Sequence, residues 1–125
     1  MALKWIAAGL VFVAGVASAQ TMNAEQFHRR ATALQKKGAM AVFSGGEIRS
    51  LMREGQAAAK KASEQRRADV SAGRKARFCP PTAKGSMGSN EFMQRLTAIP
   101  AAERARIDMT EATTRILASK YPCPA

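Results

Sequence analysis

Aromatic side chains are scarce in this sequence, which has one Trp, one Tyr and five Phe among its 125 residues. Proteins that bind single-stranded nucleic acid stack the bases on aromatic side chains. The few aromatics here fall at positions expected to lie in a core or a turn. Nucleic acid is therefore not an expected partner, even though the chain carries a net charge of +11.

The sequence has only one histidine and no recognisable catalytic motif. His28 is the only histidine, and its place beside two arginines in an expected helix is typical of a surface or boundary residue. Neither the serine-hydrolase pattern G-x-S-x-G nor the zinc-protease pattern H-E-x-x-H occurs in the sequence. We therefore expect no catalytic residues, no cofactor and no metal site, and a protein that is not an enzyme.

No apolar run reaches the length of about 20 residues that crosses a bilayer. The longest covers residues 5–16, follows Lys4 and precedes Ala17-Ser18-Ala19, the small-x-small pattern that signal peptidase cleaves. A membrane anchor is the alternative. The sequence predicts a signal peptide over residues 1–19, cleaved after Ala19, and a periplasmic or secreted product without a transmembrane anchor. That product would keep 19 Lys and Arg against 9 Asp and Glu, a net charge of +10.

The rest of the chain has no alternating strand pattern and predicts an all-α fold: a small bundle of about four helices in one domain, residues 20–125. The first helix is expected to begin after Asn23, its N-cap, and to end at Gly38. Met22 and Phe27 are spaced to form a hydrophobic staple at its start.

The second helix has the clearest start. Ser44-Gly45-Gly46-Glu47 matches the capping box S-x-x-E, in which serine caps the helix and the glutamate reaches back to the serine N–H. Phe43 and Ile48 would form a second staple, and the helix is expected to run to about Gly73. Its apolar face weakens to alanine toward the far end and comprises Ile48, Leu51, Met52, Gly55, Ala58, Ala59 and Ala62.

Pro80-Pro81 excludes a helix at that point, and a third helix is expected from about Ser89. Pro100 suits the first position of a short turn, Asp108 should cap the last helix, and Pro122 should end it. The inward residues of these helices are expected to be Phe92, Met93, Leu96, Ile99, Met109, Ala112, Thr113 and Ile116.

Only two cysteines occur, Cys79 and Cys123. In an oxidising compartment they would form one bridge that closes a loop of about 45 residues, worth about 4 kcal/mol in the chain-entropy model. Two free thiols, intermolecular pairing and a metal site are the alternatives, although two cysteines and one histidine lack the paired spacing of a zinc site. The chain thus divides into an N-terminal hairpin with a long basic helix (20–77) and a disulfide-closed helical segment (78–125).

Positive charge gathers in the N-terminal half, where residues 29–77 hold 13 Lys and Arg against four acidic residues. At about 100° per residue, five cations of the second helix fall within about 60° of one another. We name this set the basic stripe; it comprises Arg49, Arg53, Lys60, Arg67 and Arg74. It could steer an acidic protein partner or a polyanionic surface, and the plainer interpretation is a solvated helix face.

The C-terminal part of the sequence also carries a set of short motifs in order. They are Phe78-Cys79-Pro80, Phe92 to Leu96, Ile99-Pro100, Ala112 to Leu117 and Tyr121-Pro122-Cys123-Pro124. This order resembles the C-terminal half of the Rap/Tai-type immunity proteins, small periplasmic proteins linked to type VI secretion. The resemblance covers fewer than half of the residues. The family's usual N-terminal cysteines are absent here, where residues 42–46 read Val-Phe-Ser-Gly-Gly.

The resemblance implies an all-α, disulfide-linked binding protein that blocks a cell-wall-degrading amidase, and it assigns no binding residues. The first expectation is therefore a periplasmic, non-enzymatic protein whose partner is an amidase-like effector. The alternative is an envelope-associated structural or polyanion-binding protein that uses the basic helix, residues 45–73, to hold an anionic envelope component.

Overall fold

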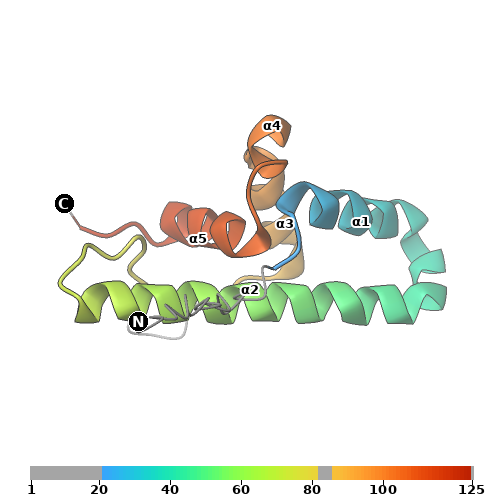
Figure 1. The fold of residues 1–125 in the computed structure, drawn as a ribbon. Coiled ribbons are helices and arrows are strands. Elements are labelled where there is room, and N and C mark those ends of the chain that lie inside the picture. Colours follow the sequence, from blue (N-terminus) through green and yellow to red (C-terminus); the bar gives the residue numbers. More distant parts are fainter. Residues whose placement is uncertain (1–20, 82–85, 125) are drawn as a thin grey trace, which may run out of the picture.

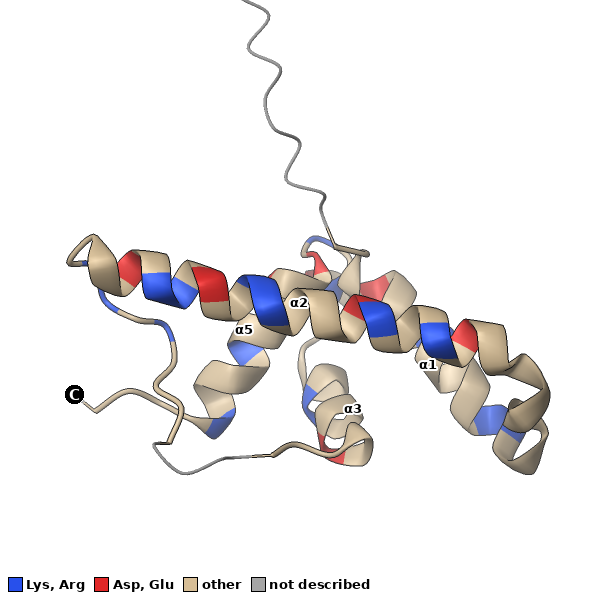
Figure 2. Cartoon of the chain, turned by 90° about the horizontal axis from the view of Figure 1, so that it is seen from below, with Lys and Arg blue, Asp and Glu red and all other residues tan. Residues whose placement is uncertain are grey.

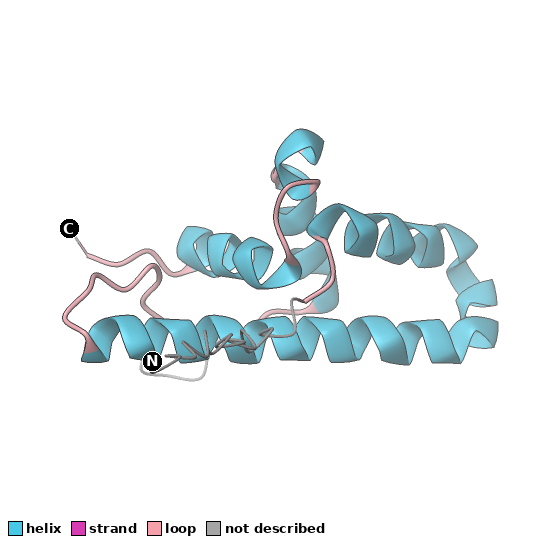
Figure 3. Ribbon diagram, viewed as in Figure 1, coloured by secondary structure: helices cyan, strands magenta, loops and turns pink. Residues whose placement is uncertain are grey.

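The structure is a computed structural model that describes residues 21–81 and 86–124. The expected signal peptide lies outside the described residues. Helices make up the regular structure of the described residues (Figure 3), and none of these helices is long and apolar enough to cross a membrane. The elements are α1 (Ala24–Lys37), the 3-10 helix η1 (Gly38–Ser44), α2 (Gly45–Ser71), α3 (Ser89–Ala98), α4 (Ala101–Arg104) and α5 (Met109–Lys120).

The arrangement confirms the predicted all-α fold with one long helix. α2 is a 27-residue rod, and α5 and α1 lie over its C-terminal and N-terminal halves (Figure 1). α3 packs against α1 and α5, and the single turn of α4 projects from the body of the molecule. The core between these elements is formed by Ala24, Phe27, Leu51, Ala58, Leu96, Met109, Ala112 and Ile116.

Two helix starts follow the predicted capping. The Asn23 side chain accepts hydrogen bonds from the backbone N–H groups of Glu25 (3.0 Å) and Gln26 (3.1 Å). The Asp108 carboxylate accepts one from the N–H of Glu111 at 2.9 Å. A pair of backbone hydrogen bonds then joins the two starts, from Ala24 to Ile107 (2.9 Å) and from Met109 to Met22 (2.7 Å). The beginnings of α1 and α5 are therefore held side by side.

The predicted capping box of the second helix is wrong. Ser44 makes no capping hydrogen bond, because η1 runs directly into α2 and leaves no extended residue between them. The Ser44 hydroxyl instead accepts a hydrogen bond from the Lys37 ammonium (3.1 Å), and the Glu47 carboxylate binds Arg30 through two contacts of 2.6 Å. The second staple is also wrong, because the Phe43 side chain is 81% exposed.

Smaller differences concern the helix ends. α2 ends at Ser71, two residues before the predicted Gly73, whose positive φ of 75° takes the chain out of the helix. Pro100 is the N-cap of α4 and not its first helical residue.

The predicted disulfide is confirmed: Cys79 is bonded to Cys123, with the two Cα atoms 4.8 Å apart. The backbone N–H of Cys79 also donates to the carbonyl of Tyr121 at 2.8 Å. Close by, the Arg66 guanidinium donates to the carbonyl of Phe78 (2.9 Å) and lies 5.9 Å from the centre of the buried Phe78 ring. The chain after α2 is thereby attached both to α2 and to the segment after α5.

Candidate binding site

An apolar groove runs along the N-terminal half of α2, open on one side, with a volume of about 490 Å³. We call it the groove. α2 forms one wall of it, and α1, α3, α5 and the residues just before α3 form the rest. It is lined by Phe27, Ala31, Leu34, Ile48, Leu51, Met52, Gly55, Gln56, Ala59, Met87, Gly88, Ser89, Phe92, Met93, Thr113, Ile116 and Leu117.

The residues of α2 explain why this space is left open. Gly55 and Ala59 line the groove with little or no side chain, so this part of α2 leaves space open between it and the facing helices. A Cβ atom built on Gly55 would meet no atom within 4 Å. Across the groove, Phe27 and Phe92 pack edge to face with their ring centres 6.3 Å apart. Met52 borders the same space and is 57% exposed, although the sequence predicts it on the inner face.

One polar group of the groove has no partner. Thr113 is 3% exposed, and its hydroxyl oxygen is buried without a hydrogen bond to any described residue. An unsatisfied buried hydroxyl destabilises a folded protein by about 1–3 kcal/mol. The neighbouring Thr114 hydroxyl, by contrast, donates to the Thr110 carbonyl at 2.8 Å. Thr113 is thus a buried hydroxyl without a partner among the described residues, next to the groove.

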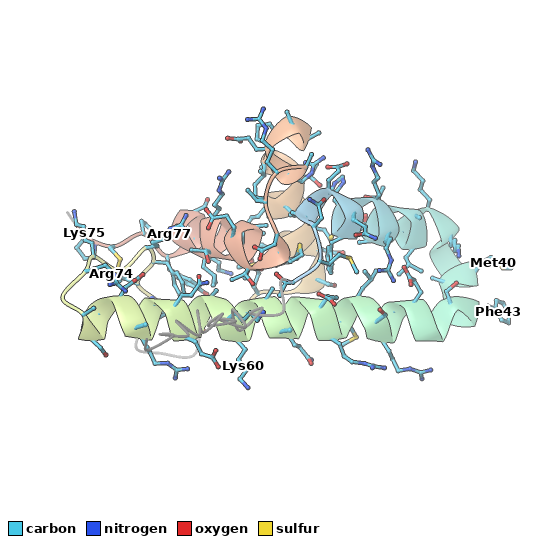
Figure 4. All side chains as sticks on the ribbon, in the orientation of Figure 1. Met40, Phe43, Lys60, Arg74, Lys75 and Arg77 are labelled. Atoms are coloured by element: carbon cyan, nitrogen blue, oxygen red, sulfur yellow. A yellow bond between two sulfur atoms is a disulfide. The ribbon has the colours of Figure 1, made fainter. Side chains whose placement is uncertain are left out.

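The basic stripe lies on the outer face of α2, next to Gln56, which lines the groove. Arg49, Arg53, Lys60 and Arg67 lie on α2, and Lys60 points away from the body of the protein (Figure 4). Gln56 lines the groove, and its position around the helix axis is about 20° from Arg49 and about 40° from Lys60. Arg74 does not belong to the stripe, because it follows the end of α2 and binds the Asp69 carboxylate at 2.9 Å.

Acidic residues interrupt the positive charge along α2 (Figure 2), but two of them are engaged elsewhere. The hydrogen bond from Arg30 holds the pKa of Glu47 below its usual value. The Glu54 carboxylate accepts a hydrogen bond from the N–H of Met22 at 3.1 Å. Neither acid forms an ion pair with the four stripe cations within residues 21–81 and 86–124, although Glu64 lies on the same side of α2 between Lys60 and Arg67.

The only histidine lies outside the groove. The His28 Nε2 atom is 3.0 Å from the Thr97 hydroxyl, across the contact between α1 and α3. Burial lowers the pKa of His28, and the nearby Arg104 guanidinium lowers it further, against an opposing effect of Glu25. The side chain is therefore a boundary residue that joins two helices, in line with its sequence context.

Comparisons with protein-family models, with curated proteins and with solved structures found no match to this chain. The resemblance to the Rap/Tai-type proteins therefore stays a prediction that rests on the short motifs of the C-terminal segment.

Proposed function

We propose that this chain is a non-enzymatic, periplasmic binding protein that takes an acidic amphipathic helix of a partner protein into the groove. The observation that carries the proposal is the open apolar groove, which has the basic stripe on the adjoining outer face of α2. Amphipathic helices bind grooves of this kind through their apolar face. Acidic residues beside that face would meet the stripe, and such charge complementarity favours one partner and one orientation.

The dimensions fit a helical segment. Between Ile48 and Ala59 the groove follows α2 for about 17 Å, at about 1.5 Å per residue, which is about three turns of a helix. Rap/Tai-type similarity adds a candidate for the partner, namely a cell-wall-degrading amidase that the bound protein would inhibit.

Gly55 provides the test, because a Cβ atom there would meet no atom within 4 Å, a leucine side chain would occupy groove space, and leucine suits a helix better than glycine. A photoreactive side chain placed at the groove residue Met52 should crosslink one protein in cells, and one at Val70 should not. Gly55→Leu should abolish that crosslink while the protein remains folded. Gly46→Leu is the matched control, because Gly46 is also a helical glycine with free space around it but lies outside the groove.

A crosslink from Met52 that persists in a folded Gly55→Leu protein would refute the groove as the binding site. If the isolated partner degrades cell wall, addition of this protein should inhibit it, and the Gly55→Leu variant should not. The polyanion-binding alternative predicts a different pattern. Joint replacement of Arg53, Lys60 and Arg67 by Gln would then release the protein from anionic envelope polymers, and Gly55→Leu would have no effect.

A further inference from the structure

The turn between α1 and α2 carries a second unassigned surface. Met40, Val42 and Phe43 in η1 are 62%, 73% and 81% exposed, and together we call them the apolar tip. Met40 and Phe43 project outward from the end of the molecule (Figure 4). Residues three apart lie on the same edge of a 3-10 helix, so the short helix presents these two side chains together. Large apolar side chains gathered at one end of a protein mark an interaction surface.

Positive charge predominates around the apolar tip, although Glu47 of α2 is close enough to Lys37 for the lysine to help lower its pKa. No Asp or Glu occurs between Gln26 and Gly46, a stretch that contains four Lys and Arg. Arg29 and Arg30 of this stretch bind Glu25 and Glu47. Lys36 and Lys37 form no ion pair with the described residues, and the Lys37 ammonium donates to the Ser44 hydroxyl at 3.1 Å. That hydrogen bond holds one cation at the base of the apolar tip.

We infer that the apolar tip inserts into the headgroup region of an anionic phospholipid bilayer, with Lys36 and Lys37 against the lipid phosphates. Short apolar segments bind reversibly to the headgroup region of a membrane, and their binding is stronger when cations lie next to them. An acidic protein surface could also attract the lysines. However, the three apolar side chains protrude from one end of the molecule, and a deformable lipid bilayer can accommodate such a protrusion without a matching pocket. The apolar tip precedes Ile48, the first groove residue of α2, and none of its residues lines the groove. The inference does not depend on the proposed partner of the groove.

Tryptophan fluorescence can test this because Trp5 is the only tryptophan of the chain. In a Trp5→Phe background, Phe43→Trp places a single reporter in the apolar tip, and Val70→Trp places a matched one on α2 far from it in sequence. Val70 is also an exposed apolar residue, at 54%. Vesicles of phosphatidylcholine with phosphatidylglycerol should shift the emission of the Phe43→Trp protein to shorter wavelength. Phosphatidylcholine alone should not do so, and the Val70→Trp protein should not respond to either.

Sedimentation of the unmodified protein with the same vesicles measures binding without the added tryptophan, which could itself increase membrane affinity. Joint replacement of Met40, Val42 and Phe43 by Ser should weaken binding to the anionic vesicles at least about tenfold, and Lys36→Gln with Lys37→Gln should weaken it by about thirtyfold. Val70→Ser should leave binding unchanged. All of these positions are exposed, so the helical circular dichroism should not change.

Three results would overturn the inference. The first is vesicle binding without an emission shift of the Phe43→Trp protein, which would assign binding to another face such as the basic stripe. The second is a shift that appears without vesicles and grows with protein concentration, which would show that the apolar tip joins two copies of the chain. The third is no binding of the unmodified protein to anionic vesicles.

Discussion

Arg104 connects three segments through one guanidinium group. It binds the Glu25 carboxylate of α1 at 2.7 Å and donates to the carbonyls of Thr97 (3.1 Å) and Ile99 at the end of α3. The last carbonyls of a helix have no partner within it, and a cation there is favourable. The Arg104 side chain is only 8% exposed, so it acts both as a buried ion pair and as the cap of α3.

The ion pair between Arg104 and Glu25 makes the stability of the folded protein depend on pH, because Glu25 must be ionised to form it. The hydrogen bond from Arg104 lowers the pKa of Glu25 below its ordinary value of 4.5, against a smaller opposing effect of burial. A lowered pKa means that the ionised carboxylate stabilises the folded state above about pH 4.5 and that this contribution is lost as the pH falls through the folded-state pKa. We expect Glu25→Gln to reduce the free energy of unfolding by about 2 kcal/mol at neutral pH and by much less at about pH 3.

Urea unfolding of both proteins at the two pH values measures this difference. Hydrogen bonds from Arg or Lys side chains also lower the pKa values of Glu47, Glu91 and Glu111. Those groups destabilise both proteins equally in acid, so the gap between native and variant isolates Glu25. An equal gap at both pH values would show that the ionisation of Glu25 is not the source of its contribution.

At the scale of the helix, α2 owes its close contact with α5 to alanine. Ala58 and Ala62 are fully or almost fully buried, at 0% and 1% exposed, and Ala58 belongs to the same core cluster as Met109, Ala112 and Ile116 of α5. Small side chains let two helices approach closely. Toward the N-terminus of α2, small side chains also leave the groove open. The close packing of α2 on α5 and the open groove therefore both result from the small residues of α2.

This packing predicts opposite outcomes for two adjacent alanines. Ala58→Leu would force a large side chain into a filled contact and should destabilise the protein by about 1–3 kcal/mol. Ala57 is exposed, so Ala57→Leu should change the free energy of unfolding by no more than about 0.5 kcal/mol. Urea denaturation of both variants tests the contrast. Equal effects of the two substitutions would contradict the orientation of α2 in the structure, in which Ala58 faces the core and Ala57 faces solvent.

The elements also show what the sequence could predict. Asn23 and Asp108 were predictable caps because the groups that they bind lie two or three residues away. Ser44 and Glu47 carry an equally good local signal, but Arg30, 17 residues away, takes the carboxylate, and a local pattern contains no information on that competition. The groove and the role of Arg104 depend on which side chains meet across the fold, so periodicity along the chain could not reveal them.

On the scale of the whole molecule, the apolar tip and the disulfide lie at opposite ends. The apolar tip lies at the turn between α1 and α2, and the disulfide joins the segments after α2 and α5 near the other end of α2 (Figures 1 and 4). Arg74, Lys75 and Arg77 lie near the disulfide, where Arg77 binds the Glu111 carboxylate of α5 at 2.8 Å. Arg77 thus helps to hold the two segments together, whereas the four stripe cations on α2 and the two lysines beside the apolar tip form no ion pair with the described residues.

The disulfide should therefore matter for stability and not for binding. The bridge spans 44 residues, and opening it should lower the free energy of unfolding by about 4 kcal/mol, chiefly because the unfolded chain gains freedom. We expect the Cys79→Ser, Cys123→Ser double variant to unfold at much lower urea concentration than the oxidised protein. The groove lies away from the bridge, and none of its lining residues is a cysteine. At a temperature where the variant is still folded, its Met52 crosslink and its binding to anionic vesicles should therefore match those of the oxidised protein. A folded variant that loses either activity would show that the disulfide shapes the binding surfaces directly, since an effect confined to the unfolded chain cannot change what the folded protein binds.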